Sequence, residues 1–270
     1  MANGSAGATE PELAFVGGVE HDMVAAAART VEEPSEFAVL PVELGFHCQR
    51  RGFPDLLEGR MTLSAFRTAM GERWWPDRVE RIATAQQLAS ALERLDAAYP
   101  TDPVGACRSF FLELATPVAE RAGRGGVVEH SQGTLVNAPT LDRLFAGARF
   151  LHVLRDGREA AAARVAAAEG PPDERPPGAH ALLDAIEWWT EELRRIDAGV
   201  RVREDGAEYG VWPDRLRVML VSGGAEQGSW EHGLSTRERR RVRRRYRRIL
   251  GDLSEAGVHC APELMDAYES

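Results

Sequence analysis

The chain has 270 residues, a formal net charge of −9 and a hydrophobic content of 44%, which together predict a globular protein. This length suits one sizeable α/β domain with a helical insert, or one domain plus a small lobe, that folds without disulfides or a metal. The acidic balance argues against nonspecific nucleic-acid binding, and no run approaches the roughly 18 apolar residues of a membrane span. All basic side chains are arginines, which excludes a Schiff-base lysine and a phosphate-loop lysine.

Residues 1–12 lack the basic and apolar regions of a signal peptide, and we expect a disordered lead-in there. Three widely spaced cysteines follow, Cys48, Cys107 and Cys260. An odd number without a secretion signal indicates buried free thiols in a reducing, cytoplasmic compartment. No His/Cys cluster has the spacing of metal ligands, so we expect no metal site.

The first half of the chain opens with a predicted strand, turn and helix. Residues 14–18 form an apolar strand that ends at a glycine pair, and residues 23–29 form a helix with Asp22 as its N-cap. Residues 44–75 mix glycine, proline and short helical pieces. Two helices are then predicted over 79–99 and 105–122, and Pro117 should kink or end the second.

The second half alternates strands and helices more regularly. Strands are expected at 126–129, 148–154 and 216–221, and helices at 139–145, 156–169, 181–198 and 236–253. A Pro-rich break at 170–178 is the segment most typical of a mobile loop. This alternation predicts an α/β fold with a parallel sheet covered by helices on both faces.

The helix expected over 236–253 carries nine arginines between Arg237 and Arg248. Apolar residues interleave with them at helical spacing, which predicts one buried stripe and a basic, solvated remainder. They are Val242, Tyr246, Ile249 and Leu250. An acidic protein partner is the alternative for this surface, and nucleic acid ranks last because of the net charge. The tryptophan pairs at 74–75 and 188–189 favour core or interface anchors over ligand platforms.

Several segments resemble the bacterial sulfotransferase family, in particular its actinobacterial members. The sequence ARFLHVLRDGREAAAA at 148–163 is similar to the strand, loop and helix that hold the 3′-phosphate of the sulfate donor. The segment VEHS at 128–131, followed by Ala138 and Pro139, resembles the V-E-K/M-T/S-P segment. ELGFH at 43–47 with FPDLLEGR at 53–60, and GSW at 228–230 with Leu234 and Ser235, match further family motifs in order.

The resemblance implies a sulfotransferase-like, P-loop-type parallel sheet flanked by helices, with a helical insert. It covers most of residues 13–257 and leaves 258–270 as a C-terminal tail. The family transfers a sulfuryl group in line from 3′-phosphoadenosine 5′-phosphosulfate (PAPS) to an alcohol, amine or phenol. That chemistry requires a glycine-rich turn and a cation beside the phosphosulfate.

The turn after the first strand departs from the family pattern G-x-x-R-S-G-T-T. His21 stands where the family has its cation, Asp22 stands where it has serine, and Met23 and Val24 replace the Gly-Thr pair. One carboxylate about 4 Å from an anionic donor would cost roughly 4 kcal/mol, close to a thousandfold in affinity. Glu20 and Asp22 should therefore repel the donor.

The residues that bind the 3′-phosphate of the donor in the family are only partly present in this sequence. Arg155 matches the arginine that the family uses for the 3′-phosphate, but Ala163 replaces its serine. The segment 221–224 also replaces the strand end near Glu-Asp-Leu that the family has. We therefore expect that PAPS does not bind in the usual way.

The remaining site residues follow strand ends. Glu20, His21 and Asp22 are candidates for a general base or for binding an ammonium group, and the alternative is a capped, solvated turn. Glu129 is a candidate base or cation-binding carboxylate, or a structural one. Arg155 should bind an anion such as sulfate. His47, His130 and Ser131 are placed on the substrate side, with His47 a core histidine as the alternative. His152 should be a core residue, and Asp156 should pair with Arg158.

The sequence keeps the anion-binding part of the site and changes the donor loop, which predicts a cofactor-independent enzyme of small-molecule, secondary metabolism. It would promote elimination or intramolecular displacement of a sulfate, or similar leaving group, from a substrate that already carries it and that is also cationic. The alternatives are a PAPS-dependent sulfotransferase with an unusual donor site and a noncatalytic subunit of a hetero-oligomer. We expect a cytoplasmic protein with a small-molecule substrate and room for a protein partner, but with no nucleic-acid or membrane partner.

Overall fold

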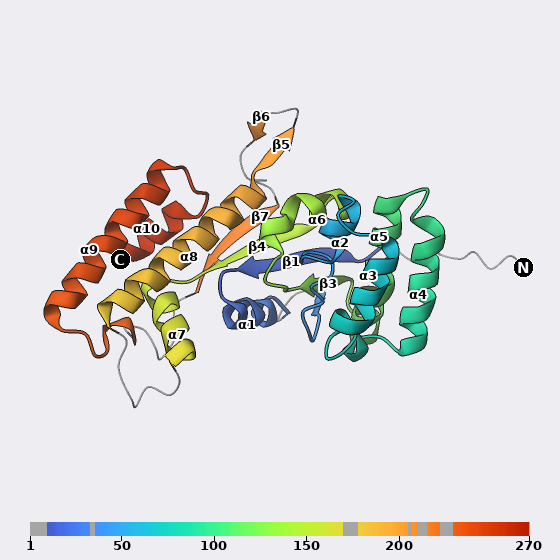
Figure 1. The fold of residues 1–270 in the computed structure, drawn as a ribbon, viewed down its shortest axis with the longest axis horizontal. Coiled ribbons are helices and arrows are strands. Elements are labelled where there is room, and N and C mark those ends of the chain that lie inside the picture. Colours follow the sequence, from blue (N-terminus) through green and yellow to red (C-terminus); the bar gives the residue numbers. More distant parts are fainter. Residues whose placement is uncertain are drawn as a thin grey trace, which may run out of the picture. The chain divides into compact units, whose positions relative to one another are not determined.

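The computed structural model describes residues 10–32, 36–169, 178–204, 207–209, 215–221 and 229–269. Within these ranges the protein has an α/β fold with a parallel sheet in the order β2-β3-β1-β4-β7 (Figure 1). The strands are β1 Glu12–Gly18, β2 Phe37–Val39, β3 Gly126–Glu129, β4 Arg149–Leu154 and β7 Leu216–Leu220. The expected α/β class with a parallel sheet flanked by helices is confirmed.

The chain divides into two compact units. The first comprises residues 1–15, 28–131 and 140–149, and the second comprises residues 16–27, 132–139 and 150–270.

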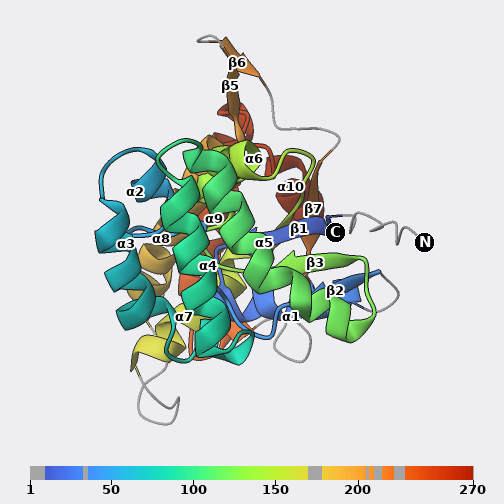
Figure 2. The same cartoon turned by 90° about the vertical axis from the view of Figure 1, so that its right-hand side faces the viewer.

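The first unit is mainly helical beyond its strands. Its helices are α2 Phe53–Leu57, α3 Leu63–Ala69, a π-turn Met70–Trp74, a 3-10 turn Val79–Arg81, α4 Ala85–Ala98 and α5 Pro103–Ala122. Helices α4 and α5 pack against each other, as both views show (Figures 1 and 2). The core is aromatic, with Phe46, Phe53 and Phe110 fully or almost fully buried, and the rings of Phe46 and Phe53 meet edge to face at 5.3 Å.

One helix prediction for this unit needs correction. The helix expected over 79–99 is split, because Thr84 and Gln87 form a capping box that starts α4 afresh. The helix expected over 105–122 is confirmed as α5, which does not end at Pro117 and is capped by Gly123, whose left-handed backbone has φ 65°. Burial of the apolar face around Phe111 and Leu114 outweighs the roughly 3 kcal/mol cost of an internal proline.

The second unit places α7 Gly157–Glu169, α8 Ala179–Val200, α9 Thr236–Glu255 and α10 Ala261–Glu269 around β4 and β7. Helix α8 packs against both α7 and α9, and a short antiparallel hairpin, β5 Val202–Glu204 and β6 Ala207–Tyr209, follows α8 (Figure 1). The apolar stripe predicted on α9 is confirmed, because Val242, Tyr246, Ile249 and Leu250 are buried.

Other boundaries differ from expectation at the ends of the chain. Helix α1 spans His21–Glu32, so Asp22 lies in its first turn and is not the N-cap. Residues 261–269 of the expected tail form α10, which contacts α9 and β7. The mobile loop expected at 170–178 lies outside the described residues except for Gly178, and residues 222–224 and 1–9 also lie outside them. No helix in the described ranges is long and apolar enough to cross a membrane.

Candidate functional site

The glycine pair that ends β1 is closely surrounded by other atoms. A side chain at Gly18 would place its Cβ 2.5 Å from the Val153 carbonyl oxygen on β4, and one at Gly17 would lie 2.7 Å from Leu135 Cγ. Both glycines are therefore required by close packing inside the second unit. After them the backbone enters helix α1 at His21.

The role of Gly18 can be tested by adding one methyl group. We expect Gly18→Ala to lower the free energy of unfolding by about 1–3 kcal/mol, because the Val153 carbonyl cannot move without disturbing β4. Gly251→Ala in α9 is the matched control, since a Cβ there meets no atom within 4 Å and should be neutral or slightly stabilising. Urea denaturation measures both, and equal stability of Gly18→Ala and the parent chain would contradict the packing role.

A cavity of about 730 Å³ opens beside this turn. Glu20 lines this cavity from the β1–α1 turn, and His21 and Asp22 line it from the first turn of α1. Arg155, the residue that directly follows β4, also lines it. The other lining residues are Val19, Met23, Gln132, Ala160, Ala163, Arg164, Ala167, Ala168 and Trp188. The small side chains of α7 leave this space open. The cavity lies at the carboxyl ends of β1 and β4, where open α/β sheets bind their ligands.

Glu20 and Arg155 form an ion pair in this cavity. Arg155 Nη1 lies 3.4 Å from Glu20 Oε1, and the two side chains are 8% and 18% exposed. Burial raises the pKa of Glu20 above its ordinary value of 4.5; Arg155 opposes this shift and Asp22 adds to it. The cavity thus holds a carboxylate that is more basic than usual, next to a buried cation. His21 and Asp22 are exposed at the same turn.

Sequence reasoning missed three polar or aromatic residues of this cavity. Core or interface packing was favoured for Trp188 over a ligand platform, yet it lines the wall, and Arg164 Cζ lies 3.8 Å from its ring centroid. Gln132 donates from Nε2 to the Val19 carbonyl at 3.1 Å. The Trp188–Trp189 pair was the only available signal, and it did not show which ring faces the cavity; Trp189 is the buried one.

The other candidate residues form a buried network in the first unit. Glu129, at the end of β3, is 1% exposed and accepts hydrogen bonds from the Leu44 N–H at 3.1 Å, the Ser131 N–H at 2.9 Å and the Ser131 hydroxyl. His47 Nε2 lies 2.9 Å from Glu129 Oε2 and is fully buried. His130 Nε2 lies 3.0 Å from the Leu40 carbonyl.

The two ionisable groups of this network shift each other strongly. Burial alone would raise the pKa of Glu129, but His47 and the hydrogen bonds from Ser131 outweigh it and lower that pKa to about 2. Burial alone would lower the pKa of His47, but Cys48 and Glu129 raise it to about 10. Glu129 and His47 therefore form a buried, ionised pair at neutral pH. His47 is a core residue here, and the role of Glu129 as a base stays a prediction.

Two further expectations concern side chains near β4. Asp156 and Arg158 pair as expected, with Arg158 Nη2 2.6 Å from Asp156 Oδ2. The guanidinium of Arg158 also faces the rings of Trp230, Tyr246 and Tyr268 at about 5 Å, which makes it a structural anchor. His152 is fully buried as expected, and so are the three free cysteines.

A groove of about 990 Å³ lies between α8 and α9. Arg245 pairs with Glu187 across it at 2.8 Å. Five other arginines of α9 line it without an ion pair to any residue that the structure describes. They are Arg237, Arg240, Arg241, Arg244 and Arg248. The predicted basic face is present and exposes a row of positive charge.

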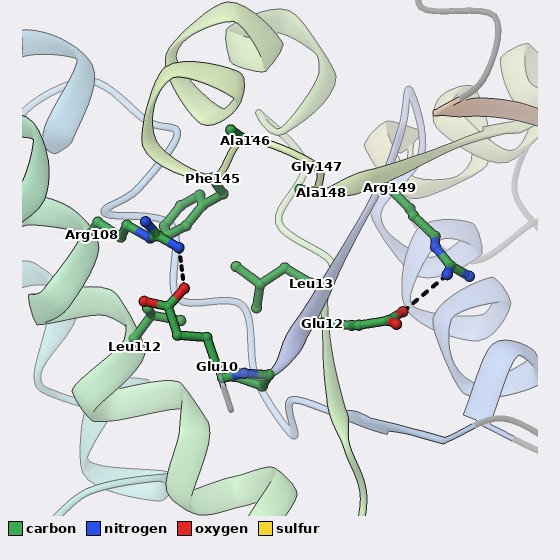
Figure 3. A pocket seen from close by; sticks show the side chains of 11 residues that line it. Glu10, Glu12, Leu13, Arg108, Leu112, Phe145, Ala146, Gly147, Ala148 and Arg149 are labelled. Carbon is green, nitrogen blue, oxygen red and sulfur yellow. Dashed lines mark hydrogen bonds and ion pairs between the residues drawn. The ribbon is translucent and has the colours of Figure 1, made fainter. Parts of the chain in front are cut away.

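A smaller cavity of about 310 Å³ lies in the first unit near the amino ends of β1 and β4 (Figure 3). Its charged side chains are already paired, Arg108 with Glu10 and Arg149 with Glu12, the latter at 3.0 Å. These pairs are largely exposed and worth little. Ligands of open parallel sheets bind at the opposite strand ends, so this cavity is the weaker candidate.

No protein-family model matches this chain, and no curated protein matches it. The resemblance drawn from sequence motifs therefore stays a prediction. The geometry by itself defines two groups of candidate residues, one lining an open cavity in the second unit and one buried in the first. Among the residues that the structure describes, the group around Glu20 and Arg155 lines a cavity with space for a substrate, whereas Glu129 and His47 are buried.

Proposed function

We propose that the chain is a sulfotransferase-like enzyme of small-molecule metabolism that acts on a substrate already bearing a sulfate or similar leaving group. The observation that carries the proposal is the Glu20–Arg155 pair, a carboxylate of raised pKa beside a buried cation inside a cavity of about 730 Å³. A base and an anion-stabilising group in one cavity suit elimination or internal displacement of an anion.

The roles follow from position. Glu20 accepts a proton from a carbon or hydroxyl of the substrate, and the released electron pair forms the new C=C or C–O bond. The C–O bond to sulfate breaks, and the sulfate dianion leaves toward Arg155 and Arg164. Asp22 and Trp188 would bind a cationic part of the substrate by charge and by the ring face. Protonated Glu20 then returns its proton to water.

The usual donor of the family does not fit the residues present. Gly17 and Gly18 are committed to packing, and Ala163 supplies no hydroxyl to the cavity. We derive no step through PAPS.

Calorimetry with adenosine 3′,5′-bisphosphate tests this misfit directly. We expect no micromolar binding by the parent chain, because the carboxylates of Glu20 and Asp22 repel the two phosphate groups of the nucleotide. Glu20→Gln should bind the nucleotide more tightly, by up to about a thousandfold if the full repulsion of roughly 4 kcal/mol is removed. Micromolar binding by the parent chain would instead favour a PAPS-dependent sulfotransferase with an unusual donor site.

The proposed reaction is tested by incubating the protein with sulfate esters that carry an acidic C–H or a hydroxyl next to the ester carbon. Ion chromatography measures free sulfate, and mass spectrometry identifies the unsaturated or cyclised product. Cationic esters should be the better substrates. If no ester in the series releases sulfate above the uncatalysed rate, the proposal fails.

A noncatalytic subunit is the second candidate, and the arginine row of α9 favours it. An acidic protein partner would neutralise this row, and charge reversal at Arg240 and Arg244 should then release the partner. Size-exclusion chromatography of the complex isolated from the native cells measures this. A stable monomer that releases sulfate would exclude this candidate.

A further inference from the structure

Three side chains that sequence spacing did not connect meet in the second unit. His152 comes from β4, and His259 and Cys260 come from the turn before α10. One ligand atom from each lies within 4.8 Å of the other two. His152 and Cys260 are fully buried, and His152 Nδ1 lies 2.8 Å from His259 Nε2. The cluster thus gathers two imidazoles and a thiol away from solvent.

Asp197 of α8 fixes the orientation of His259. Its Oδ1 accepts the His259 backbone N–H at 2.8 Å and lies 2.9 Å from the ring Nδ1, while Arg201 Nε holds Oδ2 at 2.6 Å. A proton on Nδ1 donates to this carboxylate, so the lone pair of Nε2 points toward His152. A carboxylate behind a histidine in this way is the usual support for a metal-binding imidazole.

Two buried polar atoms near the cluster lack a hydrogen-bond partner among the described residues. They are His152 Nε2 and Glu263 Oε2, and Glu263 lies three residues beyond Cys260 in the first turn of α10. Buried polar groups without partners are costly and uncommon, and they call for a ligand, a water molecule or an ion.

We propose that His152, His259 and Cys260 bind a divalent metal ion of the borderline class, with Zn²⁺ as the best match. Two imidazoles and a thiolate are typical Zn²⁺ ligands, and a water molecule would complete a tetrahedral site. Binding takes the proton from the Cys260 thiol, and the thiolate together with Asp197 balances the two positive charges. The ion would hold the segment before α10 to β4 and, through Asp197, to α8. This site is separate from the cavity of the proposed function.

The full chain, stripped with a chelator and then dialysed against Zn²⁺ or Co²⁺, tests the proposal. We expect one metal ion per chain by elemental analysis and a thiolate-to-cobalt charge-transfer band in the near ultraviolet. Saturating Zn²⁺ should raise the melting temperature by about 5 °C or more, because it binds the folded form only.

Two variants and one control separate this site from adventitious binding. Cys260→Ser should lose the charge-transfer band and most of the Zn²⁺-dependent rise in melting temperature. Asp197→Asn keeps all three ligands and should weaken Zn²⁺ affinity about 10- to 100-fold. Cys107→Ser, at another buried cysteine, should change neither readout.

A folded parent chain that takes up no Zn²⁺ or Co²⁺, or a Co²⁺ complex without the thiolate band, would overturn the proposal. So would metal binding of equal affinity in Cys260→Ser. In these cases Asp197, His259 and His152 form a chain of hydrogen bonds and nothing more. None of these three outcomes bears on sulfate release, which is proposed for the cavity that contains Glu20 and Arg155.

Discussion

Replacing Glu20 by glutamine is expected to slow sulfate release by about 10²–10⁴-fold, the usual contribution of a positioned general base. The substitution keeps the size of the side chain and removes only its ability to accept a proton. Because the negative charge of Glu20 beside Arg155 is removed, the sulfate group of the substrate should bind at least as well as before. We therefore expect kcat to fall while KM stays the same or decreases, measured by ion chromatography of released sulfate.

The pH dependence of the reaction supplies an independent check. Burial raises the pKa of Glu20 above 4.5, so the basic form is lost at a higher pH than for an exposed glutamate. The rate should accordingly fall as pH decreases, beginning above pH 4.5, and Glu20→Gln should lack this acidic limb. Glu12→Gln is the control, because Glu12 pairs with Arg149 on the surface of the other unit. An unchanged kcat in Glu20→Gln would remove Glu20 from the mechanism.

Replacing His47 by alanine is expected to destabilise the first unit by about 3–5 kcal/mol, the typical cost of leaving a buried charge without its partner. Glu129 is 1% exposed, and the Leu44 and Ser131 hydrogen bonds that remain do not supply a positive charge. Urea denaturation followed by circular dichroism measures the loss. Adding Glu129→Gln in the same chain should recover part of it, because a neutral amide needs no counterion.

The stability of the parent chain and that of the His47→Ala variant should also change with pH in different directions. In the parent chain the stability that ionised Glu129 contributes is fully present above pH 4.5 and is lost as pH falls toward 2. The His47 contribution is complete below pH 6.5 and is lost as pH rises toward 10. Without His47, burial should raise the pKa of Glu129, so the variant should gain stability as pH falls from 7 toward 5.

The control for this prediction is His180→Ala, which removes an exposed histidine paired with Asp184 and should change stability by less than about 0.5 kcal/mol. If His47→Ala costs no more than this control, the buried ion pair does not stabilise the fold. Glu129 would then regain its place as a candidate base.

The elements of the second half of the chain were predictable because their apolar periods are strong and their ends are marked. The strand expected at 148–154 is β4 Arg149–Leu154, and the helix expected at 236–253 is α9 Thr236–Glu255, which begins at the Ser235–Glu238 capping box. The single helix expected over 79–99 failed because Thr84 and Gln87 begin α4 at a capping box of their own. The helix expected over 105–122 is α5, and Pro117 remains inside it because the buried face of that helix stabilises it more than the proline destabilises it.

The candidate site was predictable only in part. Composition and motif order identified the acidic turn at Glu20 and the arginine at 155, since strand ends and charges can be located along a sequence. Only the tertiary structure paired Glu20 with Arg155, turned Trp188 toward their cavity and buried Glu129 against His47.

The sequence by itself determined the α/β class, the alternation of strands and helices, the basic face of α9 and the acidic character of the first turn. These properties depend on side-chain period and charge, which are local along the chain. The tertiary structure decided which charges meet, which histidines are buried and how His152 comes to lie beside His259 and Cys260. The contact of His152 with His259 joins residues 107 positions apart, and the energies of such contacts depend on distance and burial that no local pattern records.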